Sequence, residues 1–435
     1  MRVAVIGGGI AGLVAARDLG RAGADVTVLE RAPHLGGQAA SFSIGPGQEI
    51  ERYYHFICVG DTGYQRMLGE LGIADRLRWR VTDMGLFLDG ELHTLGDPIS
   101  LLRFPKLALR DKARFALTTA KAKFRPASGW QDLEDVSAVD WLVESYGERT
   151  YRILYQPLLE SKFQEHAPEI SAAWMWARLH RLGQSRSRTM KERIGYLVGG
   201  SAAYVDALEK SLVNLHVHLR PATAVDQVAV EDGKVTGVMI DGRQQRYDAV
   251  VSTVPVPHAL GLFEGLGGPY FDNLRSLEYL GVLVVTLRLD RSFSRYYWTN
   301  VSDVRLPMSG VIEATNLNPL PELGGDAILY IPQYLSPTSD QYGEADESVV
   351  ARYCEALALM NPAFDRSWVK EAWVHRERWT QPICRRGFTA QVPDIRTPVR
   401  GLYLTDSYQL HPHDRAISFS TDLGREAARL VLEDG

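Results

Sequence analysis

Residues 2–38 read RVAVIGGGIAGLVAARDLGRAGADVTVLERAPHLGGQ, and this stretch decides the fold. Residues 3–6 are a short apolar, β-branched run, which is typical of a buried parallel strand. Residues 10–23 carry apolar side chains at helical spacing and end at a glycine that can close the helix in a left-handed cap. Residues 26–29 predict a second buried strand. Strand, helix and strand in this order predict the first unit of a Rossmann-type α/β domain.

The glycines between the first strand and the helix form the motif G-x-G-x-x-G. Gly7 permits a tight turn, Gly9 lets the backbone approach a pyrophosphate, and Gly12 lets the helix pack against the strand. The helix that starts at Ile10 and Ala11 aims free N–H groups at the phosphates. The motif therefore predicts a dinucleotide site and leaves both NAD and FAD open.

The residues after the second strand favour one of these dinucleotides. Glu30 ends that strand, where it can accept hydrogen bonds from a ribose hydroxyl, and Arg31, Gly36, Gly37 and Gln38 follow. This stretch resembles the flavoprotein superfamily of amine oxidases, protoporphyrinogen oxidases and phytoene desaturases, which opens with G-x-G-x-x-G, then E and R or K, then G-G-R. Gln38 replaces the last arginine, which removes a charge on the phosphate side but keeps a donor. The resemblance implies FAD.

Composition sets the outer limits of function. A chain of 435 residues is long enough for two domains, and a net charge of −5 argues against nucleic-acid binding. The three cysteines lie far apart and give no disulfide framework, which fits a reducing compartment. The first strand begins at once and no apolar run reaches about 18 residues, so we expect a cytoplasmic protein. His216 and His218 have no carboxylate or cysteine at ligand spacing, so we expect no metal site.

A second resemblance covers Tyr54-His55-Phe56, which is similar to the histidine-aromatic segment of UDP-galactopyranose mutase, a related flavoenzyme. It makes His55 the first candidate for a polar group facing the flavin ring. Tyr54 and His411 are the other candidate proton carriers. A structural histidine with satisfied hydrogen bonds is the competing interpretation of His55.

Later segments of the chain also resemble the superfamily and add residues to the expected cofactor site. Gly199 and Gly200 resemble its glycine pair before a helix, and Val225 matches the strand that brackets adenine. Residues 400–406 predict a buried strand that ends at Asp406, the acid expected at the ribityl-phosphate region. The following helix, with Ile417 and Ser418 at its start, is expected to face the pyrimidine edge of the flavin and to stabilise negative charge there.

Residues 101–125, from Leu101 to Arg125, are rich in bases and have only Asp111 as an opposing acid. Leucine and phenylalanine are interleaved with the bases, so the segment could lie on an anionic membrane surface or contact an anionic substrate. A solvated helix face is the alternative. If the first interpretation holds, the protein is peripheral at the membrane.

Two features restrict the chemistry. Many amine oxidases place a lysine near the start of the strand equivalent to residues 280–290, bridged by water to flavin N5, and this chain has none between Lys234 and Lys370. This absence weighs against amines and against rapid oxygen reduction. Cys384 matches the covalent-attachment region of some amine oxidases poorly, so we expect FAD to be held non-covalently.

Together these matches predict an α/β fold: a discontinuous Rossmann-type FAD-binding domain with an inserted mixed α+β substrate domain that carries a helical cap. We expect residues 1–75, 195–257 and 374–435 to form the FAD domain, residues 76–194 the cap and residues 258–373 a sheet-containing lobe.

The resemblance implies an FAD-dependent oxidoreductase that abstracts hydride from a C–H of a small organic, isoprenoid or amine-type substrate. The alternative is a flavin-dependent nucleotide-sugar mutase or another redox-neutral isomerase. A flavin-binding protein with a regulatory or degenerate site is a third possibility, which the complete cofactor motifs disfavour. The small-molecule substrate, the electron acceptor and the oligomeric state are left open.

Overall fold

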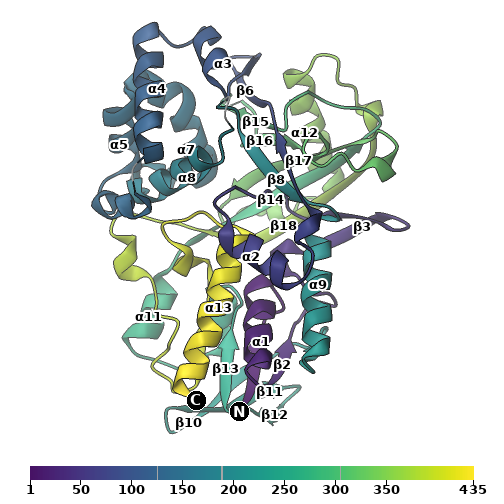
Figure 1. Ribbon diagram of the computed structural model, residues 1–435, viewed down its shortest axis with the longest axis vertical. Helices are drawn as coiled ribbons and strands as arrows, with labels where there is room; N and C mark the ends of the chain where they lie inside the picture. The colour runs from purple at the N-terminus through teal and green to yellow at the C-terminus, as the bar shows by residue number, and fades with distance from the viewer. Residues whose placement is uncertain (125, 188–189, 304) are drawn as a thin grey trace.

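A five-stranded parallel sheet forms the base of the molecule (Figure 1). The computed structural model describes residues 1–124, 126–187, 190–303 and 305–435. The sheet gathers strands from distant parts of the chain, in the order β19 (Leu402–Leu404), β13 (Ala249–Ser252), β1 (Arg2–Ile6), β2 (Asp25–Leu29) and β9 (His218–Arg220). A parallel sheet assembled in this way brings the beginning, middle and end of the chain to one edge, where a ligand can contact all three.

Three helices pack on this sheet: α1 (Ile10–Arg21), α9 (Gly200–Asn214) and α13 (Ile417–Asp434). Their apolar side chains join those of β1 and β2 in one buried cluster that includes Val5, Leu13 and Leu208. Helices α1 and α13 lie side by side, and a Cβ added at Gly424 would stand 2.3 Å from the Ala11 carbonyl oxygen. Only glycine permits this approach, which fixes the start of α13 beside the start of α1.

A seven-stranded mixed sheet forms the second lobe, and its central strand β14 (Tyr279–Leu289) pairs antiparallel with two neighbours. Side chains alternate across β14: Leu283 and Val285 pack toward α12 (Asp346–Met360), while Val282 and Val284 face the cavity described below. The remaining strands are β18 (Val369–Pro382), β17 (Ala327–Leu335), β16 (Gly310–Glu313), β15 (Trp298–Val301), β6 (Met84–Leu88) and β7 (Glu91–Thr94).

A helical group lies beside the mixed sheet, at the end of the molecule far from the chain termini (Figure 1), and its helices α7 and α8 supply side chains to the cavity described below. It is held together by aromatic contacts such as Phe163 against Trp174, whose ring centroids lie 4.7 Å apart. Its helices are α3 (Pro98–Arg103), α4 (Leu109–Phe124), α5 (Ala138–Tyr146), α6 (Glu148–Thr150), α7 (Gln156–Phe163) and α8 (Ala172–Gln184).

Smaller elements connect these parts. They are the helices α2 (Thr62–Glu70), α10 (Val256–Leu262) and α11 (Pro269–Ser276), the hairpin β3 (Ser41–Gly45) and β4 (Gln48–Glu51), the pair β5 (Leu77–Val81) and β8 (Arg193–Leu197), and the meander β10 (Gln227–Glu231), β11 (Lys234–Ile240) and β12 (Arg243–Arg246).

The expected fold class is confirmed, with local differences. Val225 was expected to lie on a strand, but residues 223–226 are irregular, and β10 begins only at Gln227. Strands β6 and β7 lie within residues 76–194, so that range is not wholly helical, and β18 crosses the expected boundary at residue 374. The domain division stays a prediction.

Arg125, the last residue of the basic segment, lies outside the described residues. Within the described ranges, no helix has the length and apolarity needed to cross a membrane.

Candidate active site

One cavity of about 540 Å³ lies between the parallel sheet, the mixed sheet and the helical group. This volume is within the range of about 300–1,000 Å³ typical of ligand sites. The cavity brings together residues that are far apart in the sequence. Those predicted from sequence that line it are Gly7, Gly9, Ile10, Ala11, Glu30, Arg31, Gly36, Gly37, Gln38, Tyr54, His55, Val225, Asp406 and Ile417.

The glycines of the motif have two roles: Gly7 and Gly12 allow tight backbone packing, and Gly9 leaves space in the cavity. Gly7 has a φ of +106°, which favours glycine, and a Cβ at Gly12 would stand 2.0 Å from the Gly7 carbonyl oxygen. Gly9 differs, because its φ is −74° and an added Cβ would meet only Gly37 Cα, at 4.0 Å. A side chain at Gly9 would therefore enter the cavity. No described side chain caps α1, so its first N–H groups are free to bind an anion.

Glu30 is held at the end of β2 by two backbone donors. Its carboxylate accepts hydrogen bonds from the Gly8 and Ala32 N–H groups, each at 2.7 Å. The Thr223 N–H donates to the Glu30 carbonyl oxygen at 2.8 Å, which brings the loop with Val225 against the acid. These contacts set an acid and an irregular backbone segment side by side, as an adenosine group requires.

The other end of the cavity is built by the C-terminal segment. Asp406 is buried, and its carboxylate accepts from the Val256 N–H, the Tyr279 hydroxyl and the Ser407 hydroxyl at 2.6 Å each. Burial raises the pKa of Asp406. No described side chain caps α13, whose first residue, Ile417, lines the cavity. A second uncapped helix start thus faces the same space as that of α1.

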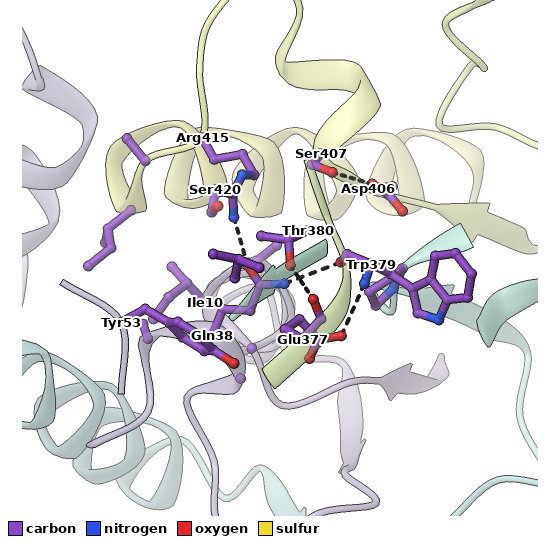
Figure 2. A pocket seen from close by; sticks show the side chains of 18 of the residues that line it. Ile10, Gln38, Tyr53, Glu377, Trp379, Thr380, Asp406, Ser407, Arg415 and Ser420 are labelled. Atoms are coloured by element: carbon purple, nitrogen blue, oxygen red, sulfur yellow. Dashed lines mark hydrogen bonds between the residues drawn. The ribbon is translucent and has the colours of Figure 1, made fainter. Parts of the chain in front are cut away.

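Gln38 lies between two distant parts of the chain (Figure 2). Its side-chain oxygen accepts from Arg415 Nη1 at 3.1 Å, and its amide donates to the Trp379 carbonyl oxygen at 3.4 Å. The position that carries arginine in the resembling superfamily therefore holds glutamine here, with an arginine from the C-terminal segment beside it.

His55 stands where the main cavity meets a smaller one of about 90 Å³, and it lines both. Its ring Nδ1 lies 3.6 Å from Glu51 Oε2 and has no hydrogen-bond partner among the described residues. The other oxygen of Glu51 accepts from the Ser201 N–H at the start of α9, so this acid is tied to the backbone. Tyr54 lines the same two cavities, and burial raises its pKa well above 10.

Three predicted residues do not line the main cavity. Gly12 acts in packing, as described above. Ser418 lines the smaller cavity, and its hydroxyl accepts from the Tyr64 N–H at 3.1 Å. The ring of His411 is buried, with Nε2 2.9 Å from Glu134 Oε2, and it packs against Trp130 and Phe388. The proton-carrier role predicted for His411 therefore has no support from its position, because protein side chains surround the ring.

Sequence reasoning missed a charged cluster on the cavity wall, formed by Lys162, Arg178, Asp414, Arg415 and Tyr334. Lys162 Nζ lies 2.8 Å and Arg178 Nη1 2.7 Å from the same Asp414 oxygen. Burial alone would raise the pKa of Asp414, but these cations and Arg415 outweigh it and hold the pKa far below its usual value. No local signal marks Lys162, because its helix α7 reads QPLLESKF and mixes polar with apolar residues.

Comparison with known proteins identifies the family. The sequence model of the flavin-containing amine oxidoreductases matches residues 10–432. The chain belongs to this family. It is accordingly a flavin oxidoreductase, and its cofactor is FAD.

Individual members of the flavin-containing amine oxidoreductase family are only distantly similar. A 15-cis-phytoene desaturase of Synechococcus elongatus is 23% identical, over 99% of this chain and 96% of its own length. A reduced UDP-galactopyranose mutase has the same fold with a TM-score of 0.75 at 16% identity, covering 99% of this chain and 95% of its own. Cyclohexylamine oxidase from Brevibacterium oxydans gives a TM-score of 0.72 at 16% identity, covering 99% and 98%.

Proposed function

We propose that this enzyme dehydrogenates an organic substrate, passing hydride from a substrate C–H to FAD. The observation that carries the proposal is that one cavity is lined by the glycine turn, by the starts of α1 and α13, and by walls from the helical group and the mixed sheet. A cofactor and a substrate held in one cavity can react directly, without a mobile carrier.

The described residues fit FAD at both ends of the cavity. We propose that the start of α1 and the open space at Gly9 take the pyrophosphate, and that Glu30 and Val225 take the adenosine. The start of α13, at Ile417, would lie at the ring. When bound, FAD supplies the two-electron acceptor that no amino-acid side chain provides. Helix N–H groups at Ile417 favour negative charge, so they support the ring when it gains electrons.

The apolar side chains of the mixed sheet form the wall that we expect to contact the substrate. Val282 and Val284 from β14 and Trp298 from β15 line the cavity on the side of the mixed sheet. Such side chains exclude water and orient an apolar carbon chain, and both effects favour hydride transfer over side reactions.

We propose His55 as the group that accepts a substrate proton. Its Nδ1 is buried and unpartnered within the described chain, whereas Tyr54 keeps its proton because burial raises its pKa. Removing a positioned base typically costs about 10²–10⁴ in rate. We therefore expect His55→Ala to keep FAD and to slow flavin bleaching by a substrate at least about a hundredfold. A variant that keeps both FAD and the full rate would remove His55 from the mechanism.

We propose that FAD is held non-covalently. Cys384 is buried and absent from the cavity lining, and burial raises the pKa of its thiol far above the usual range. The flavin should therefore pass into the supernatant when the protein is precipitated with acid. A yellow pellet would contradict this prediction.

A redox-neutral isomerase is the second candidate, and the charged cluster at Lys162 favours it, because an apolar substrate alone does not use such a group. Anaerobic mixing separates the two. A dehydrogenase loses the 450-nm flavin band in proportion to substrate added (about one equivalent per FAD), because each substrate gives up one hydride. An isomerase turns over only after prior reduction and takes up no net electrons. A colourless native preparation would overturn both.

A further inference from the structure

We infer that the cavity contains a subsite for an anionic group of the substrate, a carboxylate or a phosphate, formed by Lys162, Arg178 and Arg415. The inference rests on the proposed function, since it places the substrate in the same cavity as FAD. It narrows the substrate to an amphiphile, with an anionic end at this subsite and an apolar body along the mixed sheet.

The charges at the subsite do not balance. Lys162 and Arg178 share the single carboxylate of Asp414, with nitrogen–oxygen distances of 2.8 Å and 2.7 Å. Arg415 donates to the amide oxygens of Gln38 and Gln381, at 3.1 Å and 3.5 Å, and the part of the chain that the structure describes gives it no carboxylate within ion-pair distance. The three cations therefore outnumber the one carboxylate that they contact, which leaves an excess of positive charge at neutral pH.

Lys162 is buried, and Arg178 and Arg415 are half-buried on the cavity wall. Lys162 is 5% exposed, and its Nζ lies 4.8 Å from the ring centroid of Trp174 and 5.2 Å from that of Tyr334. A charge without a counter-ion in such a setting destabilises the protein until a ligand of opposite charge enters. Since Arg178 and Arg415 both line the cavity, an anion placed there can accept from both guanidinium groups.

The groups next to Lys162, Arg178 and Arg415 also indicate a positive electrostatic potential at the subsite. Burial alone would raise the pKa of Tyr334, but Lys162 and Arg415 outweigh it and lower the pKa below 10. Arg181, the next cation on the wall, is already neutralised by a bidentate pair with Asp61, at 2.9 Å and 2.7 Å. Glu377 also lines the cavity, on β18, where it accepts from the Trp379 N–H at 3.3 Å. If Glu377 is counted with Asp414, three cations still face two carboxylates.

The apolar part of the cavity wall determines which body the anionic ligand can carry. Leu158, Val282, Val284 and Trp298 offer apolar surface in the same cavity. A hydrocarbon without a charged group would fill this surface and leave the cations unpaired, while a small inorganic anion would leave the apolar surface unused. An anionic amphiphile satisfies both parts.

Calorimetric titration of the FAD-loaded protein tests the inference with four probes: octyl phosphate, octanoate, octanol and inorganic phosphate. We expect one or both anionic amphiphiles to bind at least about tenfold more tightly than octanol and than inorganic phosphate, since charge and tail act together. Tighter binding of octyl phosphate identifies a phosphate ligand, and tighter binding of octanoate identifies a carboxylate. Octanol that binds as tightly as both anions overturns the inference.

Variants assign the effect to the named residues. Arg178→Gln and Arg415→Gln should each weaken the anionic amphiphile about fivefold or more and leave octanol unchanged. Arg275→Gln, on the outer helix α11 and paired there with Asp272, is the matched control and should change neither. Unchanged anion binding in both cavity variants overturns the inference, and so does loss of FAD in proportion to the lost anion binding, which would assign the cations to the cofactor.

These outcomes are separate from failure of the proposed function. A protein that retains FAD but shows no preference for anions refutes the subsite alone. A protein without bound FAD refutes the proposed function before any titration begins. If a cavity variant fails to fold, the comparison of octyl phosphate, octanoate and octanol on the unaltered protein still decides the question.

Discussion

At the scale of single residues, Gly9 shows most directly how the sequence prepares the cofactor site. Its backbone needs no glycine, because its φ is −74°, but its missing side chain leaves the cavity open. We expect Gly9→Val to fold and to lose most of its flavin. Gly69→Val, at an exposed helical position with open space around its Cα, is the control. The ratio of absorbance at 450 nm to that at 280 nm measures flavin retention, and a yellow Gly9→Val protein would contradict the assignment.

Glu313 gives a prediction about pH. It is 1% exposed, and burial raises its pKa from 4.5 to about 7. Between these two values the folded protein binds more protons than the unfolded chain, so the free energy of unfolding falls as pH rises through this window. The full loss is at most about 3 kcal/mol. Glu313→Gln keeps the shape and can still bond the Ser292 hydroxyl and the Ser294 N–H.

The measurement for Glu313 is a comparison of thermal unfolding midpoints at pH 5 and pH 8. We expect Glu313→Gln to raise the midpoint at pH 8, where the native enzyme carries the buried charge, and to change it little at pH 5. Equal shifts at both pH values would show that the carboxyl group does not titrate during unfolding.

A functional residue can be predicted from sequence when the residues around it form a recognisable local pattern. Glu30 could be found because the chain around it makes a local pattern of strand, turn and helix. The partners of Lys162 could not, because Asp414 is 252 residues away and only the tertiary fold joins them. The surroundings of His411 could not be foreseen for the same reason, since Glu134 and two aromatic rings from distant segments pack around it, and its proton-carrier role stays a prediction.

At the scale of elements, the contact between α1 and α13 determines whether two helix starts meet at one cavity. Gly424 permits that contact, because an added Cβ would stand 2.3 Å from the Ala11 carbonyl oxygen. We expect Gly424→Val to push the helices apart, to cost about 1–3 kcal/mol of stability and to weaken FAD binding together with it. Gly69→Val serves again as the control, since its Cβ meets nothing within 4 Å. Unchanged unfolding and unchanged flavin content would refute this account of the contact.

Elements with strong periodicity were predicted well. Residues 10–23 form α1 over Ile10–Arg21, and residues 280–290 form β14 over Tyr279–Leu289. The elements that were not predicted are strands that pair with strands far away in the sequence. Strands β6 and β7 join the mixed sheet through a parallel pairing with β15, more than 200 residues later in the chain. Nothing in the local sequence reveals such a partner, so residues 76–194 were expected to be a helical cap.

At the scale of the whole molecule, α3 and α4 form an outer end, well away from the two chain termini (Figure 1). This end carries large apolar side chains in full contact with solvent: Ile99 is 64% exposed, Leu102 61%, Leu109 75% and Leu117 58%. The exposed bases Arg103, Arg110, Arg114 and Lys121 alternate with them along the sequence. Exposed apolar side chains interleaved with bases are typical of a segment that binds anionic lipid.

We therefore predict that the protein binds anionic vesicles through this end. Each leucine that enters the interface contributes about 1.5–3 kcal/mol and each nearby base about 1 kcal/mol, so replacing two leucines should weaken binding at least about tenfold. Leu102→Glu combined with Leu109→Glu should reduce co-sedimentation with phosphatidylglycerol vesicles. Leu359→Glu, equally exposed at 64% but on α12, should not. Binding to phosphatidylcholine vesicles should be weak for all three proteins, because the bases then have no partner. If the double variant still sediments with the anionic vesicles, the exposed leucines of α3 and α4 do not form the membrane contact.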